Sequence, residues 1–127
     1  MARIDPRNPK HMVESIVLND YKARKFNKET FRELLAGMRA LPKLRSIEIQ
    51  LNGINDTCLQ ELDELIKLKN LRRIDLSRNE IGKIGINKMC ELLRNPDYKH
   101  LEWLDISGNN YFSENTALNM LATVLRD

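Results

Sequence analysis

Two short segments of the sequence place a carboxylate two residues before a hydroxyl: Asp75-Leu-Ser77 and Asp105-Ile-Ser107. A third carboxylate, Glu48, stands 27 residues before Asp75. Carboxylates beside hydroxyls are residue types that could transfer protons, activate a nucleophile or bind a hard metal ion. The first question is therefore whether the rest of the chain supports such chemistry.

Further catalytic signals do not accompany these residues. The two histidines, His11 and His100, stand apart from the carboxylates in the sequence, and no glycine-bearing calcium-loop spacing occurs. Neither a phosphate-binding glycine loop nor a GxSxG nucleophile motif is present. We therefore predict no catalytic residues, no metal site and no cofactor, and we expect that the protein is not an enzyme.

The Asp/Ser pairs are instead positions of a repeated frame. Apolar residues at positions 1, 4, 6 and 11, with Asn at position 9, recur three times: Leu71, Ile74, Leu76, Asn79 and Ile81; Leu101, Leu104, Ile106, Asn109 and Tyr111; Leu44, Ile47, Ile49, Asn52 and Ile54. In this frame the Asp and Ser residues occupy positions 5 and 7. A first copy, Val13, Ile16 and Leu18, is degenerate because Tyr21 replaces the Asn.

The spacing of the copies predicts the domain organisation. Repeat starts at Val13, Leu44, Leu71 and Leu101 leave room for a helix after each strand. We expect one domain over residues 12–127, with repeats at about 13–43, 44–70, 71–100 and 101–126. Residues 1–11 lack apolar periodicity and carry three cations, so we interpret them as a basic arm or leader.

Cap residues and apolar spacing predict one helix in each repeat. The first begins after Asn27 and extends to about residue 38, burying Phe31, Leu34, Leu35 and Met38. The second begins at Asn55 or Asp56 and buries Leu59, Leu62, Leu65 and Ile66. The third covers about 84–93 and buries Ile86, Met89 and Leu93, and the fourth covers about 113–126 after a Ser113 cap, with Leu118, Leu121 and Leu125 apolar.

The pattern LxxLxLxxNxI, with repeats of 27–31 residues, resembles the leucine-rich repeat family and is similar to its ribonuclease-inhibitor-like class. The resemblance implies a right-handed α/β solenoid of about four strand–helix repeats, with parallel strands on the concave face. It implies that positions 1, 4, 6 and 11 point inward and that the Asn at position 9 binds the backbone of the turn. It also implies a protein of the eukaryotic cell interior, and we expect a cytoplasmic location.

In such a solenoid, positions 3, 5 and 7 of each strand face outward by the period-2 alternation of a strand. Position 3 gives Ser15, Ser46, Arg73 and Trp103, and position 5 gives Val17, Glu48, Asp75 and Asp105. We predict that a protein partner binds Trp103, Arg73, Asp75, Asp105 and Glu48, because aromatic and Arg side chains dominate interface energetics. The alternative is internal: Arg73 stacks on Trp103, and the stacked acids are compensated by Arg73.

These rows favour a non-enzymatic scaffold or adaptor module that binds proteins, as a monomer or within a hetero-complex. Charge suggests an alternative, since residues 1–45 carry +6 and residues 46–127 carry −3. RNA or an acidic partner could bind the basic half through Arg3, Arg7, Lys10, Lys22, Arg24, Lys25 and Lys28. A structural subunit of a larger cytoskeletal or axonemal assembly is a third reading, because family members include regulators of actin ends and axonemal subunits.

The two cysteines, Cys58 and Cys90, fall in predicted helices at different repeat positions. We expect buried free thiols rather than a disulfide, which is typical of a reducing compartment.

Overall fold

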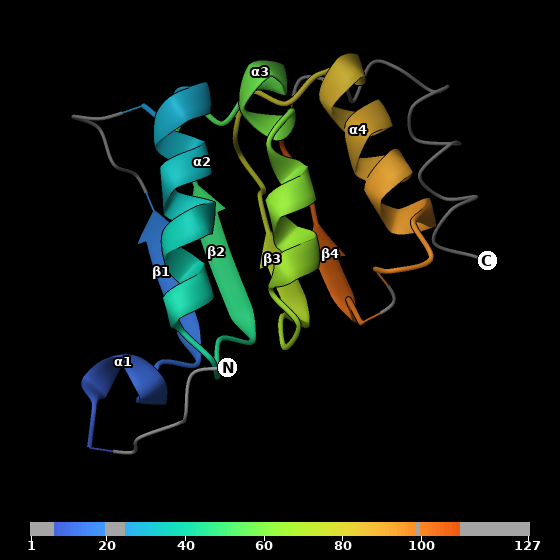
Figure 1. Cartoon of the computed structure of the whole chain (residues 1–127). Coiled ribbons are helices and arrows are strands. Elements are labelled where there is room, and N and C mark those ends of the chain that lie inside the picture. The colour runs from blue at the N-terminus through green and yellow to red at the C-terminus, as the bar shows by residue number, and fades with distance from the viewer. Residues whose placement is uncertain (1–6, 20–24, 99, 110–127) are drawn as a thin grey trace.

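The computed structural model describes residues 7–19, 25–98 and 100–109. Four parallel strands pair in chain order in one sheet: β1 (Ser15–Asn19), β2 (Ser46–Gln50), β3 (Arg73–Asp75) and β4 (Trp103–Asp105). The helices α2 (Lys28–Gly37), α3 (Asp56–Leu59) and α4 (Lys83–Arg94) form a second layer on one side of the sheet (Figure 1). Short 3-10 helices, η1 (Met38–Ala40) and η2 (Leu62–Lys67), extend the helical segments of the first two repeats. The predicted α/β repeat solenoid is confirmed, while the predicted fourth helix lies outside the described residues.

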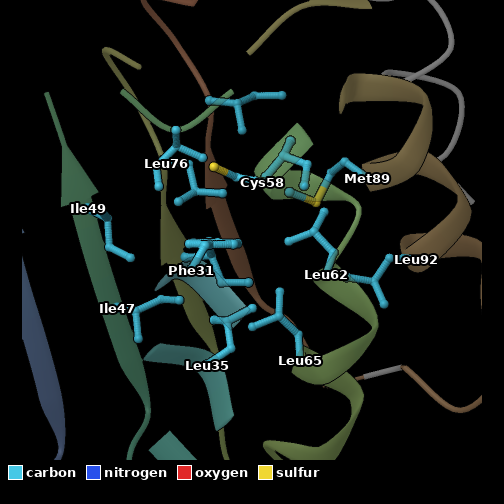
Figure 2. Packing of buried hydrophobic residues seen from close by; sticks show 14 of the residues in the cluster. Phe31, Leu35, Ile47, Ile49, Cys58, Leu62, Leu65, Leu76, Met89 and Leu92 are labelled. Atoms are coloured by element: carbon cyan, nitrogen blue, oxygen red, sulfur yellow. The ribbon is translucent and has the colours of Figure 1, made fainter. Parts of the chain in front are cut away.

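The register of the sheet follows the repeat frame. Ile16 pairs with Ile47, Ile47 with Ile74, and Ile74 with Leu104, so position 4 lies at the same level in every strand. Figure 2 shows Ile47 and Ile49 pointing from β2 toward side chains of the helical layer, such as Phe31 and Leu35. The side of the sheet that bears positions 4 and 6 is therefore packed on the helices, and the opposite side bears positions 3, 5 and 7.

Buried asparagines at position 9 form a ladder through the turns that follow β2, β3 and β4. The amide nitrogen of Asn79 donates to the carbonyls of Ile49 and Leu76, at 2.7 and 3.0 Å. Its Oδ1 accepts from the backbone N–H groups of Asn52 and Ile54, at 3.1 and 3.2 Å. The predicted role of the asparagine is confirmed, and the contacts additionally join each repeat to the repeat before it.

Position 8 of the frame, which precedes the asparagine, adopts a left-handed backbone. Leu51, Arg78 and Gly108 have φ of 58°, 57° and 71°. Two of these residues are not glycine, and such a conformation costs them of order 1 kcal/mol or more. Because the same conformation recurs in three repeats, it belongs to the turn that the asparagine ladder fixes rather than to one local site.

The helical segments differ between repeats. In α2 the side chain of Asn27 accepts from the Thr30 N–H at 2.8 Å, and Thr30 Oγ1 accepts from the Asn27 N–H at 2.9 Å. This capping box confirms the predicted start of the first helix. In α4 the predicted bounds are also close, and Ile86 and Met89 are buried as predicted. At the end of the helix Leu92 is buried and Leu93, the predicted core residue, is only half-buried.

The second repeat does not contain the continuous α-helix that the sequence analysis predicts. Asn55 caps α3, which ends after one turn, and η2 follows. Leucines recur at every third residue here and all are buried: Leu59, Leu62, Leu65 and Leu68. A 3-10 helix has three residues per turn, so this spacing places them on one line. Ile66, predicted as a core residue, is therefore only half-buried.

The predicted arm is partly helical. Asn8 caps a single turn, α1 (Pro9–Met12), by accepting from the Lys10 N–H at 3.0 Å. None of the residues of α1 is buried, so this turn lies outside the core. Within the described residues, no helix is long and apolar enough to cross a membrane.

Candidate interaction surface

The strand face is the side of the sheet that bears positions 3, 5 and 7. On it the predicted rows are in register: Arg73 pairs with Trp103, Glu48 with Asp75, and Asp75 with Asp105. The structure therefore brings together all five residues predicted to bind a partner. Their exposure differs, and that difference decides what each could do.

Trp103 is the largest apolar side chain of this surface and belongs to β4, the last strand of the described sheet. It remains 41% exposed, although it belongs to a strand of the sheet. The guanidinium carbon of Arg73 lies 4.1 Å from the centroid of its ring, which is cation–π geometry. Arg73 Nη1 also lies 4.0 Å from Glu48 Oε1, so the guanidinium is held between an aromatic ring and a carboxylate. The internal pairing considered in the sequence analysis is present, yet 41% of Trp103 still meets solvent.

Glu48 is steadied from its other side. The amide nitrogen of Asn19, on the neighbouring strand β1, donates to Glu48 Oε2. The side chain of Glu48 is 21% exposed and that of Arg73 is 43% exposed. Three consecutive strands thus fix one acid and one guanidinium on the strand face. The role of Asn19 was not predicted, and its place at position 7 beside a carboxylate is the signal that points to it.

Asp75 is buried, contrary to the prediction that position 5 is exposed throughout. Only 4% of the residue meets solvent. Its Oδ1 accepts from the N–H and the hydroxyl of Ser77, at 2.9 and 2.6 Å. Its Oδ2 accepts from Gln50 Nε2 at 3.0 Å. The period of the sequence predicts the face of the sheet to which a side chain points. Burial also depends on the length of the side chains on the adjacent strand, and here the Gln50 amide covers the Asp75 carboxylate.

Asp105 repeats the local geometry of Asp75 with more exposure. Its Oδ1 accepts from the N–H and the hydroxyl of Ser107, at 2.9 and 2.7 Å. These hydrogen bonds, with the nearby charges of Arg73 and Arg78, lower the pKa of Asp105 below its ordinary value. The carboxylate is therefore ionised at neutral pH, and its half-buried position leaves it open to a partner cation.

Val17 adds an apolar group that the predicted contact set omits. It occupies position 5 on β1, pairs with Glu48, and is 60% exposed. The signal was visible in the sequence as an aliphatic residue in a row otherwise made of acids. The strand face consequently has exposed apolar groups on β1 and β4, with charged side chains between them.

The cysteines and His100, residue types that often act in catalysis or metal binding, pack within the fold. Cys58 and Cys90 are buried free thiols, and burial raises the pKa of each. His100 packs edge-to-face on Tyr98, at 4.8 Å between ring centroids. Among the residues that the structure describes, no group of three His, Cys, Asp or Glu side chains is arranged to hold a metal ion.

Comparisons with known proteins agree with this geometry. The leucine rich repeat family matches residues 67–90. Among solved structures, the C-terminal domain of tropomodulin from Caenorhabditis elegans is similar with a TM-score of 0.56 at 15% identity, over 91% of this chain and 84% of that chain. No curated protein matches the sequence.

The repeat frame, the parallel sheet with its helical layer, and these similarities define the class of fold: the chain is an α/β repeat solenoid of the leucine-rich repeat kind. At 15% identity, the likeness to the tropomodulin domain extends to the fold alone.

Proposed function

We propose that this protein is a non-enzymatic protein-interaction module that binds its partner through the strand face, as a scaffold or adaptor. The observation that carries the proposal is Trp103, the single tryptophan of the chain, held 41% exposed beneath the guanidinium of Arg73. A large aromatic side chain on an uncovered sheet face leaves apolar area in water, and a partner that covers it gains the corresponding free energy.

The geometry limits the cost of binding. Arg73 is already held by Trp103 and Glu48, and Glu48 by Asn19. Association therefore orders few side chains that were free beforehand, which leaves more of the contact energy as affinity. Buried aromatic and Arg residues of this kind often contribute ~2 kcal/mol or more each to an interface.

The charges of the strand face indicate the chemistry of the partner. Arg73 is the one cation in the rows at positions 3 and 5, and these rows hold three carboxylates. Glu48 already pairs with Arg73, and Asp75 is buried under Gln50. Asp105 is the carboxylate left for an external cation. We infer a partner segment in which a Lys or Arg lies beside an apolar side chain that covers Trp103.

The alternative site in the basic N-terminal half has weaker support. Of the seven cations considered, Arg3, Lys22 and Arg24 lie outside the described residues. Lys25 pairs with Glu80 at 3.2 Å, and Lys28 lies 3.9 Å from Glu61. These acids belong to later repeats, so part of the charge asymmetry between the two halves is neutralised inside the solenoid.

Two further expectations belong to the same proposal. The buried free thiols of Cys58 and Cys90 favour a reducing compartment, and we infer a cytoplasmic location. A structural subunit of a cytoskeletal assembly would present the same strand face. The fold shared with a tropomodulin domain is compatible with that role, and a binding partner identified by experiment would decide between them.

The test is a pull-down from eukaryotic cytosolic extract with the whole chain as bait, comparing wild type with Trp103→Ala at low and high salt. Ile84→Ala is the matched control, because Ile84 is an apolar side chain of α4 that is 65% exposed in the helical layer. Far-UV circular dichroism establishes that both variants fold.

We expect Trp103→Ala to lose a set of proteins that wild type and Ile84→Ala retain in high salt, because apolar contacts are insensitive to screening. Retention of all partners by Trp103→Ala would remove the strand face as the site. If Trp103→Ala leaves binding unchanged and high salt abolishes it, the basic N-terminal half binds the partner instead.

A further inference from the structure

Two arginines stand side by side where the strands of the sheet begin. Position 2 of the frame holds Glu14, Arg45, Arg72 and Glu102 in the four repeats, so the two cations follow one another between two acids. The N–H of Arg45 donates to the Glu14 carbonyl, and the N–H of Arg72 to the Arg45 carbonyl, at 2.8 and 2.7 Å. The two arginines therefore stand on adjacent strands, about 4.8 Å apart, where like charges destabilise the sheet.

This edge of the sheet is hollowed. A cavity of about 300 Å³ is lined by Glu14, Lys43, Arg45, Asn70 and Arg72. Its walls come from three consecutive repeats, so the fold rather than one flexible loop assembles it. Three of the five lining side chains are cations, and one is an acid.

These cations lack internal ion-pair partners, unlike Glu48 at position 5 of the frame, which pairs with Arg73. In the described part of the chain, no carboxylate lies within ion-pair distance of Lys43 or Arg45. Arg72 donates from Nη1 to the carbonyls of Lys69 and Leu71, at 3.0 and 3.2 Å, which fixes its guanidinium without neutralising it. The contrast with Glu48, which is compensated by Arg73 and Asn19, indicates that an external anion supplies the missing charge.

The neighbouring side chains register the same positive potential. His100 is the last residue of the third repeat, as Asn70 is the last residue of the second. Burial lowers the pKa of His100, and the charges of Arg72 and Lys69 lower it further. His100 does not itself line the cavity, so the groups that could bind an anion are those of the lining residues.

We propose that this cavity binds a phosphate group, carried by a phosphate monoester or by inorganic phosphate, with Lys43, Arg45 and Arg72 as the anion-binding residues. The three cations and Glu14 sum to +2, which matches the charge of about −1.5 to −2 on a phosphate monoester at pH 7. Arginine guanidinium groups bind phosphate oxygens in pairs, and Asn70 offers a further polar group at the wall. The site uses none of the strand-face contacts, so it does not depend on the interaction proposed for Trp103.

The experiment is a titration of the whole ¹⁵N-labelled chain with inorganic phosphate, followed by amide chemical shifts at constant ionic strength maintained with sodium chloride. We expect saturable shifts confined to residues 43–46 and 70–73. Arg45→Gln and Lys43→Gln should each weaken binding about tenfold, because a charge-assisted hydrogen bond is lost. Arg45 is exposed, so its replacement leaves the core untouched.

The matched control is Arg32→Gln, which removes the same charge from the exposed face of α2 and should leave the affinity unchanged. Saturable binding that weakens equally in Arg32→Gln, or no saturable shift at all, would overturn the proposal. O-phosphoserine and serine then distinguish sources of the group. Tighter binding of O-phosphoserine than of inorganic phosphate assigns the site to a phosphorylated side chain, and equal affinity assigns it to free phosphate. Either result supports a phosphate site.

Discussion

The second and third repeats share one strand frame but build their helical halves differently. Their strands, β2 and β3, are in register over Ser46–Arg73, Ile47–Ile74 and Glu48–Asp75. On the other side of the core, the second repeat has one α-helical turn and a 3-10 helix, whereas the third has a continuous α-helix. The strand half is therefore the constant part of the repeat, and the helical half is the variable part.

The difference has a physical cause in what fixes each half. Strands and turns are held by hydrogen bonds between asparagine side chains and the backbone of the neighbouring repeat, so their geometry must repeat. Helical segments are held by apolar burial, which is not directional. A segment with leucines every third residue can therefore bury them as a 3-10 helix, and a segment with a 3.6-residue period can bury them as an α-helix.

The largest effect expected from this contrast is at the asparagine ladder. Asn79→Ala removes the acceptor for two buried N–H groups, those of Asn52 and Ile54. An unsatisfied buried donor costs roughly 1–3 kcal/mol, so we expect a loss of about 4 kcal/mol in urea unfolding followed by circular dichroism.

Asn52→Ala is the matched variant in the preceding repeat. Asn52 Nδ2 donates to the carbonyls of Leu18 and Gln50, but its buried Oδ1 accepts no hydrogen bond in the described part of the chain. We expect a loss of about half that of Asn79→Ala. Equal losses would show that the ladder is not what joins the second and third repeats.

The helical contrast predicts the next effect, at two adjacent apolar residues of η2. Leu65 is 1% exposed, while Ile66 is half-buried. Leu65→Ala should cost about 3 kcal/mol and Ile66→Ala about 1 kcal/mol, by the same unfolding measurement. Equal losses would mean that both side chains are buried in solution, as in the α-helix that the sequence analysis predicts.

The strand half was predictable from the sequence and the helical half only in part. Position 9 requires a side chain with both a donor and an acceptor, so Asn52, Asn79 and Asn109 mark the turns without ambiguity. In the second repeat, the step from Leu59 to Leu62 fits a three-residue period and a 3.6-residue period about equally well. Only packing against α2 and α4 selects between them, and packing is a property of the whole molecule.

For the interaction surface, the sequence predicted which face of the sheet each side chain points to, but not how exposed each side chain is. Strand alternation placed Arg73, Trp103, Glu48 and Asp105 on the strand face in the correct register. It did not reveal that Gln50 covers Asp75, because the reach of a long side chain on the neighbouring strand is not encoded in the period. The cation–π contact was among the alternatives because register alone placed Arg73 beside Trp103.

The helices of the third and first repeats each contain a glycine, Gly85 and Gly37, and the space around the two glycines differs. A Cβ at Gly85 of α4 would lie 2.5 Å from Asp56 Oδ1 and 2.9 Å from Leu59 Cδ1, whereas a Cβ at Gly37 of α2 would meet nothing within 4 Å. Gly85→Ala should therefore cost about 2 kcal/mol through overpacking, although alanine favours helix. Gly37→Ala should gain about 0.5 kcal/mol. Stabilisation by Gly85→Ala would contradict the close approach of the two repeats.

The smallest expected effect concerns Asp56, the residue of the second repeat that lies closest to Gly85. The N-cap residue of α4 is Gly82, which has no side chain to cap the helix, and the Gly82 N–H donates to Asp56 Oδ1 at 2.6 Å. Asp56 of the second repeat thus caps the helix of the third, and Asp56→Ala should cost about 1 kcal/mol. The Asp56 carboxylate also occupies the space that a Cβ at position 85 would need, which accounts for a glycine there.

Removing the carboxylate also removes part of the overlap in Gly85→Ala. The double variant should consequently lose about 1 kcal/mol less than the sum of the two single losses, since residues in contact are coupled. The remaining cost reflects the approach to Ile81 and Leu59, which Asp56→Ala leaves in place. Strict additivity in the double-mutant cycle would separate the two roles. Asp56 would then cap α4 without setting the size of residue 85, and the contrast between the second and third repeats would rest on apolar packing alone.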